Sequence, residues 1–190
     1  MDPNFKSWEL IGIVLERVIK NMEITQYNST PPNCFNSMHA PTISMRSYLH
    51  RIHLYANCSD SCYILAFIYL DRLLQNNPGF VLSNRNVHRL ILSAVVLAIK
   101  YLEDYYADNL TYAKIGGVSL TEMNRLETAM LRLLHYNLHI DNKIYFQYVN
   151  ELELQRQKIM EEEMDWSEEY VKPTKEILSL ETFCSEMSYE

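Results

Sequence analysis

Two pairs of side chains in this sequence have a spacing that suits metal binding. His135 and His139 are four residues apart, as are Cys58 and Cys62, and this spacing places two ligands on one face of a helix. The residue after His135 is not the glutamate that a zinc hydrolase uses as its base, and Cys62 begins an apolar segment where a free thiol behaves as a small hydrophobe. No second pair completes either ligand set, so we expect no metal and no cofactor.

The sequence also lacks the common motifs of phosphate-binding and hydrolytic enzymes. The segment 115–117 has neither the length nor the Lys-Ser/Thr of a phosphate loop, and there is no G-x-S-x-G elbow. We therefore expect a protein without catalytic activity. A metal-dependent hydrolase using His135 and His139 is the enzyme-class alternative, and stoichiometric zinc in the purified protein would support it.

One apolar segment organises the rest of the chain. Residues 90–99, LILSAVVLAI, are interrupted only by Ser93, and a helix that is apolar all round belongs at the centre of a bundle. It is too short to cross a bilayer, which needs about 20 residues. Ser83 and Asn84 are expected to cap its start, and Lys100 marks the point where it reaches the surface.

Composition favours an all-α chain. Hydrophobic residues make up 48% of the 190 residues, and there are only four glycines and six prolines, with few runs of alternating polarity. The four cysteines come without a signal-peptide pattern, which suggests reduced thiols in the cytoplasm, the nucleus or both.

The charge distribution argues against a nucleic-acid partner. Residues 1–150 contain 13 Lys and Arg against 12 Asp and Glu, whereas residues 151–190 contain 4 against 12. A near-neutral body with an acidic tail has no basic surface of the kind that nucleic acids need. We expect no membrane partner either.

The apolar pattern divides the chain into three regions. Residues 1–42 hold an amphipathic helix over about 7–23, with Ser7 as a possible cap, and then a Pro-containing linker. Residues 43–140 hold five helical patterns. Residues 141–190 hold one helix, capped by Asp141, and an acidic tail that starts at Glu161. Within the tail, Trp166 and Tyr170 are candidate residues of a docking segment. The stripe of the first helix is Trp8, Ile11, Leu15, Val18 and Met22.

Local signals place the ends of the later helices in the central region. A short helix over 111–115 is expected to stop at Gly116-Gly117, where glycine can adopt the left-handed conformation. Ser119 and Glu122 form an S-x-x-E capping box at the start of the next helix.

Four segments, in order, resemble the cyclin box. They are YILAFIYLDRLL (63–74), LILSAVVLAIKYLED (90–104), YAKIGGVS (112–119) and EMNRLETAMLRLLHYNL (122–138). The likeness covers about half of the chain, and it is strongest to P/U-type cyclins, in which the fourth helix runs into a similar I-G-G-V-S. It implies a single five-helix cyclin box with flanking N- and C-terminal helices. The residues after His139 are too few for a second box.

The resemblance implies a regulatory subunit that binds and activates a cyclin-dependent serine/threonine protein kinase, monomeric apart from that kinase. In the family, the lysine ending the third helix and a glutamate in the fifth hold the kinase's αC helix, and Lys100 and Glu127 are the matching positions. Correct αC placement completes the kinase's Lys–Glu pair over the ATP phosphates. From composition alone, Lys100 would only complement a helix dipole, and Glu127 would be a solvated helix residue.

Four more positions match the family's kinase contacts. Tyr101 follows the lysine, as an aromatic residue does there, and Leu131, Tyr136 and Leu138 fall at the offsets of its hydrophobic contacts. An apolar patch ringed by polar groups suits a binding hot spot. The alternative is that the last three simply finish a core helix.

Asp71 lies within an apolar helical segment, where an unpaired carboxylate would be costly, so it should find a cation. We expect a structural ion pair with Arg51. Arg46 is the other candidate, because segment 45–49 is similar to the M-R-A-I-L start of mitotic-type boxes, although it sits about one turn too close to Asp71.

A second class of function remains open: a cyclin-fold transcription adaptor that contacts nucleic acid or general factors. The near-neutral body and the acidic tail speak against it. Tight, salt-sensitive DNA binding in a filter-binding assay would support it.

Overall fold

The computed structural model describes residues 6–25 and 33–165 of the chain, and these residues form helices and no strand. The prediction of an all-α chain, with five helices between two flanking ones, is confirmed. None of the helices in the described ranges combines the length and the apolarity that crossing a membrane requires. The helices are α1 (Ser7–Thr25), α2 (Met45–Ala56), α3 (Asp60–Asn76), α4 (Val87–Leu102), α5 (Asn109–Gly116), α6 (Leu120–Leu133) and α7 (Asn142–Asp165).

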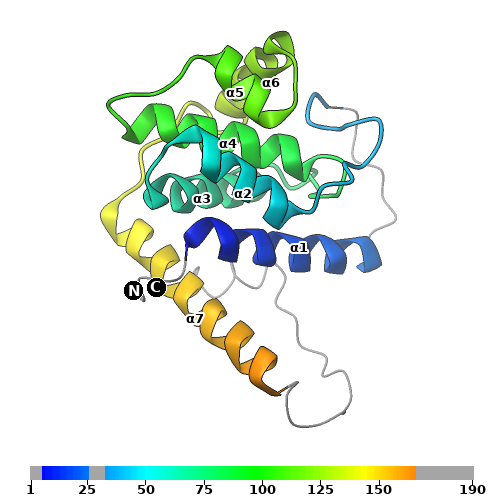
Figure 1. Cartoon of the computed structure of the whole chain (residues 1–190), viewed down its shortest axis with the longest axis vertical. Coiled ribbons are helices and arrows are strands. Elements are labelled where there is room, and N and C mark those ends of the chain that lie inside the picture. Colours follow the sequence, from blue (N-terminus) through cyan, green and yellow to red (C-terminus); the bar gives the residue numbers. More distant parts are fainter. Residues whose placement is uncertain (1–5, 26–32, 166–190) are drawn as a thin grey trace.

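The apolar helix α4 lies at the centre of the bundle. All residues from Leu90 to Ile99 are buried, including Ser93, whose hydroxyl donates to the Arg89 carbonyl at 2.7 Å. α4 packs most extensively on α3 and also contacts α2, α5 and α6. In Figure 1, α5 and α6 lie at one end of this stack and α1 at the other, while α7 packs against α3 and α1. The core therefore forms around the segment that has no polar face.

Short polar side chains cap α6 and α7 as predicted. Ser119 accepts a hydrogen bond from the Glu122 amide at 3.1 Å, and Asp141 accepts one from the Lys143 amide at 2.7 Å. The Glu122 carboxylate does not accept a bond from the Ser119 amide, which would complete the capping box, because it lies 2.5 Å from the guanidinium of Arg89. Glu122 thus ties the start of α6 to α4 instead of closing its own cap.

The start of α4 differs from the prediction. Asn86 occupies the N-cap position, and its side chain makes no capping bond. Its Oδ1 accepts from the Ser83 amide at 2.9 Å, and its Nδ2 donates to the Val81 carbonyl at 2.8 Å. The assignment of Ser83 and Asn84 as caps was therefore wrong, because the side chain of Asn86 closes the preceding turn on itself.

The amphipathic pattern of α1 is confirmed, but Ser7 is not its cap. Ser7 is the first helical residue, its amide donates to Asp60 at 3.1 Å, and its hydroxyl bonds the same carboxylate. This contact ties the start of α1 to the first turn of α3. The predicted stripe is buried at Trp8, Ile11, Leu15 and Val18.

The last helix is longer than predicted. α7 continues past Glu161, so the acidic run begins on a helix, where Glu161 and Glu162 are exposed. Glu162 pairs with Arg17 of α1 at 2.8 Å. Trp166 and Tyr170 lie outside the described residues, as does the rest of the predicted tail.

Two glycines shape the end of α5. Gly117 has φ 70°, and its amide donates to the Lys114 carbonyl at 3.3 Å, which confirms the predicted left-handed end. Gly116 lies against α4, where an added Cβ would be 3.0 Å from Leu92 Cδ1 and closer still to Cδ2. Close packing of α5 on α4 therefore requires glycine at this position.

We expect Gly116→Ala to lower the free energy of unfolding by about 1–3 kcal/mol, because the methyl group must displace the Leu92 side chain in a packed core. Urea unfolding followed by circular dichroism measures the change. Gly79→Ala is the matched control, since no atom lies within 4 Å of its added Cβ. Equal effects of the two substitutions would contradict this account.

Candidate functional site

The two charged residues predicted to act together, Lys100 and Glu127, form a direct ion pair. Lys100 Nζ lies 2.5 Å from Glu127 Oε1 and also donates to Oδ1 of Asn109 at 2.7 Å. The Asn109 amide group donates to Glu127 Oε2 and to Asn124 Oδ1, both at 2.7 Å. These four side chains join the last turn of α4 and the start of α5 to the side of α6. We call them the Lys100 network.

Local capping delivers Asn109 to the network. Asp108 is the N-cap of α5 and accepts bonds from the amide and hydroxyl of Thr111, both at 2.8 Å. These bonds hold the pKa of Asp108 below its usual value, chiefly through the Thr111 amide. Asn109 is then the first helical residue and faces Lys100. Sequence reasoning missed Asn109 and Asn124, because a polar residue in a loop or on a helix carries no signal of its partner.

The Lys100 network can donate and accept further hydrogen bonds. The side chains of Lys100 and Glu127 keep 25% and 16% of their accessible surface, so the pair is reachable from outside. Lys100 has a third N–H donor beyond the two used among the described residues, and each Glu127 oxygen can accept another bond. The pair can therefore bind an unpaired backbone carbonyl or an unpaired backbone amide on a docked segment, whichever that segment presents.

The segment after α6 is fixed against α3 and α4. Arg72 of α3 donates to the carbonyls of Asn137 and His139 at 2.8 and 3.2 Å, and the Tyr69 hydroxyl donates to the Leu138 carbonyl at 2.9 Å. On α4, the Tyr101 hydroxyl lies 3.3 Å from His139 Nδ1. The structure therefore brings Tyr101 and segment 137–139 together, through two α3 side chains that sequence reasoning did not single out.

The three predicted hydrophobic contacts differ in exposure. Leu131 and Leu138 are half-buried and pack on the core, so they contribute to both the core and the surface. Tyr136 keeps 65% of its accessible surface and has φ 58°, next to His135 with φ 52°. Two consecutive residues with side chains in the left-handed region are unusual, and such strain often marks a functional position. The alternative that Tyr136 finishes a core helix is wrong, because it follows α6 and faces solvent.

More apolar surface lies beside Lys100 than the sequence predicted. The loop after α4 and the start of α5 expose further large side chains, of which Tyr105 is 93% exposed. Large apolar groups held in solvent at one edge of a domain often mark a docking surface. The residues are Leu102, Tyr105, Tyr106 and Leu110.

The predicted ion pair between Asp71 and Arg51 is not formed. Asp71 is buried on α3 and accepts bonds from Gln75, at 2.9 Å, and from the hydroxyl of Tyr148 on α7. The Arg51 guanidinium lies 5.0 Å from the centre of the Tyr48 ring on its own helix. The prediction of Arg51 was wrong, because the side chains of Gln75 and Tyr148 donate to this carboxylate, and the bond from Tyr148 fixes α7 on α3.

Arg46, the other candidate partner of Asp71, lies elsewhere. Its guanidinium bonds Glu9 of α1 at 3.0 Å, and its backbone amide donates to Glu16 at 3.2 Å. Its role is to join α2 to α1.

The histidine pair does not have the geometry of a helical metal site. α6 ends before His135, so His135 and His139 do not share a helical face. Among the described residues no group of three His, Cys, Asp or Glu side chains could hold a metal ion. Cys34, Cys58 and Cys62 are free thiols.

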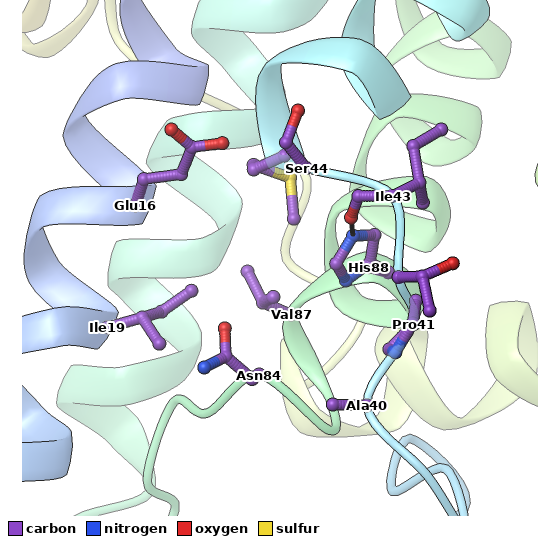
Figure 2. Close-up of a pocket in the computed structure, with 11 residues that line it drawn as sticks. Glu16, Ile19, Ala40, Pro41, Ile43, Ser44, Asn84, Val87 and His88 are labelled. Carbon is purple, nitrogen blue, oxygen red and sulfur yellow. Dashed lines mark hydrogen bonds between the residues drawn. The ribbon is translucent and has the colours of Figure 1, made fainter.

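A small pocket lies away from these residues, between α1, segment 40–45 and the start of α4 (Figure 2). Two of its polar groups have partners: Glu16 accepts from the Arg46 amide, and His88 Nε2 lies 2.9 Å from the Ile43 carbonyl. The other ring nitrogen of His88, Nδ1, is buried without a hydrogen-bond partner among the described residues. Burial holds the pKa of His88 below its usual value. None of the predicted site residues lines this pocket.

Comparison with known proteins agrees with this fold. Residues 11–138 match the family model described as Cyclin. Over 146 residues the chain is 39% identical to Cyclin-U4-1 of Arabidopsis thaliana, which covers 75% of this chain and 72% of that protein. It is 43% identical to Cyclin-U4-2 of Arabidopsis thaliana over 128 residues and 40% identical to Cyclin-P4-1 of Oryza sativa subsp. japonica over 116 residues. These two matches cover 67% and 61% of this chain, and 58% and 55% of the relatives.

The chain therefore belongs to the cyclin family. Within that family its relatives are U-type and P-type cyclins, which confirms the resemblance found in the sequence. The division of the chain at residues 42 and 140 stays a prediction.

We expect a double-mutant cycle with Lys100→Met and Glu127→Gln to give a coupling free energy of about 1–2 kcal/mol, because the pair is half-buried and shares Asn109. Urea unfolding of the single and double variants measures it. The control cycle uses Arg46→Met and Glu9→Gln, a pair with 51% and 36% exposure, and should give below about 0.5 kcal/mol. Similar coupling in both cycles would show that the Lys100 network adds nothing beyond a surface pair.

Proposed function

We propose that this chain is a regulatory subunit that binds and activates a cyclin-dependent serine/threonine protein kinase, without catalysis of its own. The observation that carries this proposal is the Lys100 network, a half-buried ion pair with unused hydrogen-bonding capacity at the edge of the cyclin box. Membership of the cyclin family supports the class of partner.

The network suits the end of a partner helix. The last carbonyls and first amides of a helix lack partners within it, and an ammonium beside a carboxylate offers a donor and an acceptor together. In this proposal, Lys100 and Glu127 hold the αC helix of the kinase in its active position. That position completes the kinase's own Lys–Glu pair over the ATP phosphates.

The neighbouring apolar side chains would supply most of the contact area. Tyr101 lies one residue beyond Lys100, and Tyr136 and Leu138 belong to the segment that Arg72 fixes. Tyrosine is favoured in binding hot spots because it buries a large rigid ring and keeps a polar end. The ion pair would then fix the orientation of the partner, while the rings and leucines contribute affinity.

We expect Lys100→Glu to abolish association with the kinase. The new carboxylate at position 100 would face that of Glu127, and the donor for the partner's carbonyls would be lost. The experiment is affinity capture of the tagged chain from its own cells, with mass spectrometry of bound proteins and a phosphorylation assay. Lys158→Glu on α7 makes the same charge change at an exposed site and should retain the kinase.

Circular dichroism must show that Lys100→Glu is folded. If the folded variant captures active kinase as well as the unchanged protein does, the assignment of Lys100 is wrong. If neither protein captures a kinase, the proposed function itself fails.

Tyr136→Gly should separate stability from binding. Glycine adopts a positive φ without strain, so we expect the free energy of unfolding to stay the same or to rise by up to about 1 kcal/mol. Loss of the exposed ring should weaken kinase binding by about tenfold or more. Titration by surface plasmon resonance measures binding.

Tyr55→Ala removes a tyrosine of similar exposure, 67%, from α2 and should leave affinity unchanged. A drop in stability without a change in affinity would assign Tyr136 a structural role only.

A further inference from the structure

Two thiols lie close together in the turn that joins α2 to α3. Cys58 directly precedes Ser59, the N-cap residue of α3, and Cys62 lies in the first turn of that helix. The Cys62 amide donates to the Ser59 carbonyl at 3.1 Å, which closes the turn between them. Cys58 is partly exposed, whereas Cys62 is fully buried. An oxidant from solution can therefore reach Cys58 first.

The buried thiol is tied to the end of α4. Cys62 Sγ donates to Glu103 Oε1 at 3.2 Å, and the same oxygen accepts from the Ser59 amide at 2.8 Å. These bonds, chiefly the one from the Ser59 amide, hold the pKa of Glu103 below its usual value. Glu103 follows α4 directly, three residues after Lys100. The turn that holds the thiols is thus connected to the helix that carries the Lys100 network.

The two sulfurs differ in chemical character. Hydrogen bonding between the two thiols lowers the pKa of Cys58, in spite of partial burial. The same interaction, together with burial, raises the pKa of Cys62. Cys34 offers a comparison, because burial raises its pKa and neither of the other two described thiols influences it. A lower pKa increases the fraction of reactive thiolate at neutral pH.

We propose that Cys58 and Cys62 form a reversible disulfide when the chain meets hydrogen peroxide. The Cys58 thiolate attacks one peroxide oxygen and displaces hydroxide, so that sulfur is oxidised to sulfenic acid and peroxide is reduced. The Cys62 thiol then attacks the Cys58 sulfur, the S–O bond breaks, and water leaves with the Cys62 proton. One peroxide and two thiols thus give one disulfide and two waters, and a reducing dithiol reverses the bond.

The position of Cys58 permits the closure. A disulfide needs Cα atoms about 4.4–6.8 Å apart, and the bond from the Cys62 amide to the Ser59 carbonyl turns Cys62 back toward the residue that precedes Ser59. Because Cys58 precedes the helix, its backbone can adjust without unwinding α3. Such a bond is compatible with a reducing compartment, where disulfides are mainly transient and redox-sensing.

Oxidation also removes the Cys62 S–H donor from Glu103, so that Ser59 alone, through its amide and its side chain, links the turn to that carboxylate among the described residues. An effect on partner binding through α4 rests on the proposed function. The disulfide itself does not, and it can be tested on the chain alone.

The test exposes the full reduced chain to hydrogen peroxide, removes the peroxide with catalase, and alkylates all free thiols in denaturant with N-ethylmaleimide. Trypsin releases residues 52–72 as one peptide that contains both cysteines. We expect this peptide to lose two hydrogen atoms in mass and to carry no alkyl group. After treatment with dithiothreitol it should carry two.

Variants distinguish the order of events. Cys58→Ser should leave Cys62 fully alkylated, because the accessible thiolate is gone. Cys62→Ser should trap Cys58 as sulfenic or sulfinic acid. Cys34→Ser and Lys100→Glu should form the disulfide at the unchanged rate, so failure of the kinase proposal would not affect this result. On the folded chain, a short pulse of iodoacetamide should label Cys58 about tenfold faster than Cys34.

Two alkyl groups on the 52–72 peptide after peroxide would overturn the proposal. So would a sulfinic acid on Cys58 beside a free Cys62 in the unchanged chain, or a bridge from either residue to Cys34 or Cys184.

Discussion

The structure depends on the burial of one helix that has no polar face. Residues 90–99 are inaccessible to solvent, and a helix of this kind is stable only when other helices cover it on all sides. α2, α3, α5 and α6 provide this cover, and α1 and α7 pack outside them. The close approach of α5 even requires glycine at position 116, because Leu92 fills the space where a side chain would be. The arrangement of these four covering helices follows from this requirement.

The surface proposed to bind the kinase forms where the buried helix reaches water. Lys100 emerges beside the start of α5 and the side of α6, and Asn109 joins its ammonium to the Glu127 carboxylate. A partly buried ion pair is costly unless further hydrogen bonds satisfy it. Asn109 supplies one bond to each charged group, and Asn124 accepts a bond from the Asn109 amide group. Nearby, α3 fixes segment 137–139 through Arg72 and Tyr69. The bundle therefore presents a rigid surface, which suits a protein that positions a partner and leaves the chemistry to it.

The same end of α4 has a second connection. Glu103 receives bonds from the turn between α2 and α3, where Cys58 and Cys62 lie. Oxidation of these thiols would alter the hydrogen bonds to Glu103, which directly follows the helix that carries Lys100. The Asp71 carboxylate has a different role, since Tyr148 and Gln75 satisfy it and thereby hold α7 against α3. Buried polar groups thus fix where the outer helices dock, whereas apolar burial supplies most of the stability.

The sequence by itself determined the helical class, the central segment, the number of helices, the caps at Ser119 and Asp141 and the left-handed end at Gly117, because these follow from periodicity and from bonds between residues close in the chain. It also identified Lys100 and Glu127, but only through resemblance to cyclins. Tertiary structure alone decided which side chains meet. In the folded chain, Asn109 lies between Lys100 and Glu127, and Asp71 accepts a bond from Tyr148 instead of pairing with Arg51. Glu122 pairs with Arg89, and Tyr136 is exposed. Those contacts join residues far apart in the chain, and local patterns do not specify such pairings because many polar residues could serve equally well.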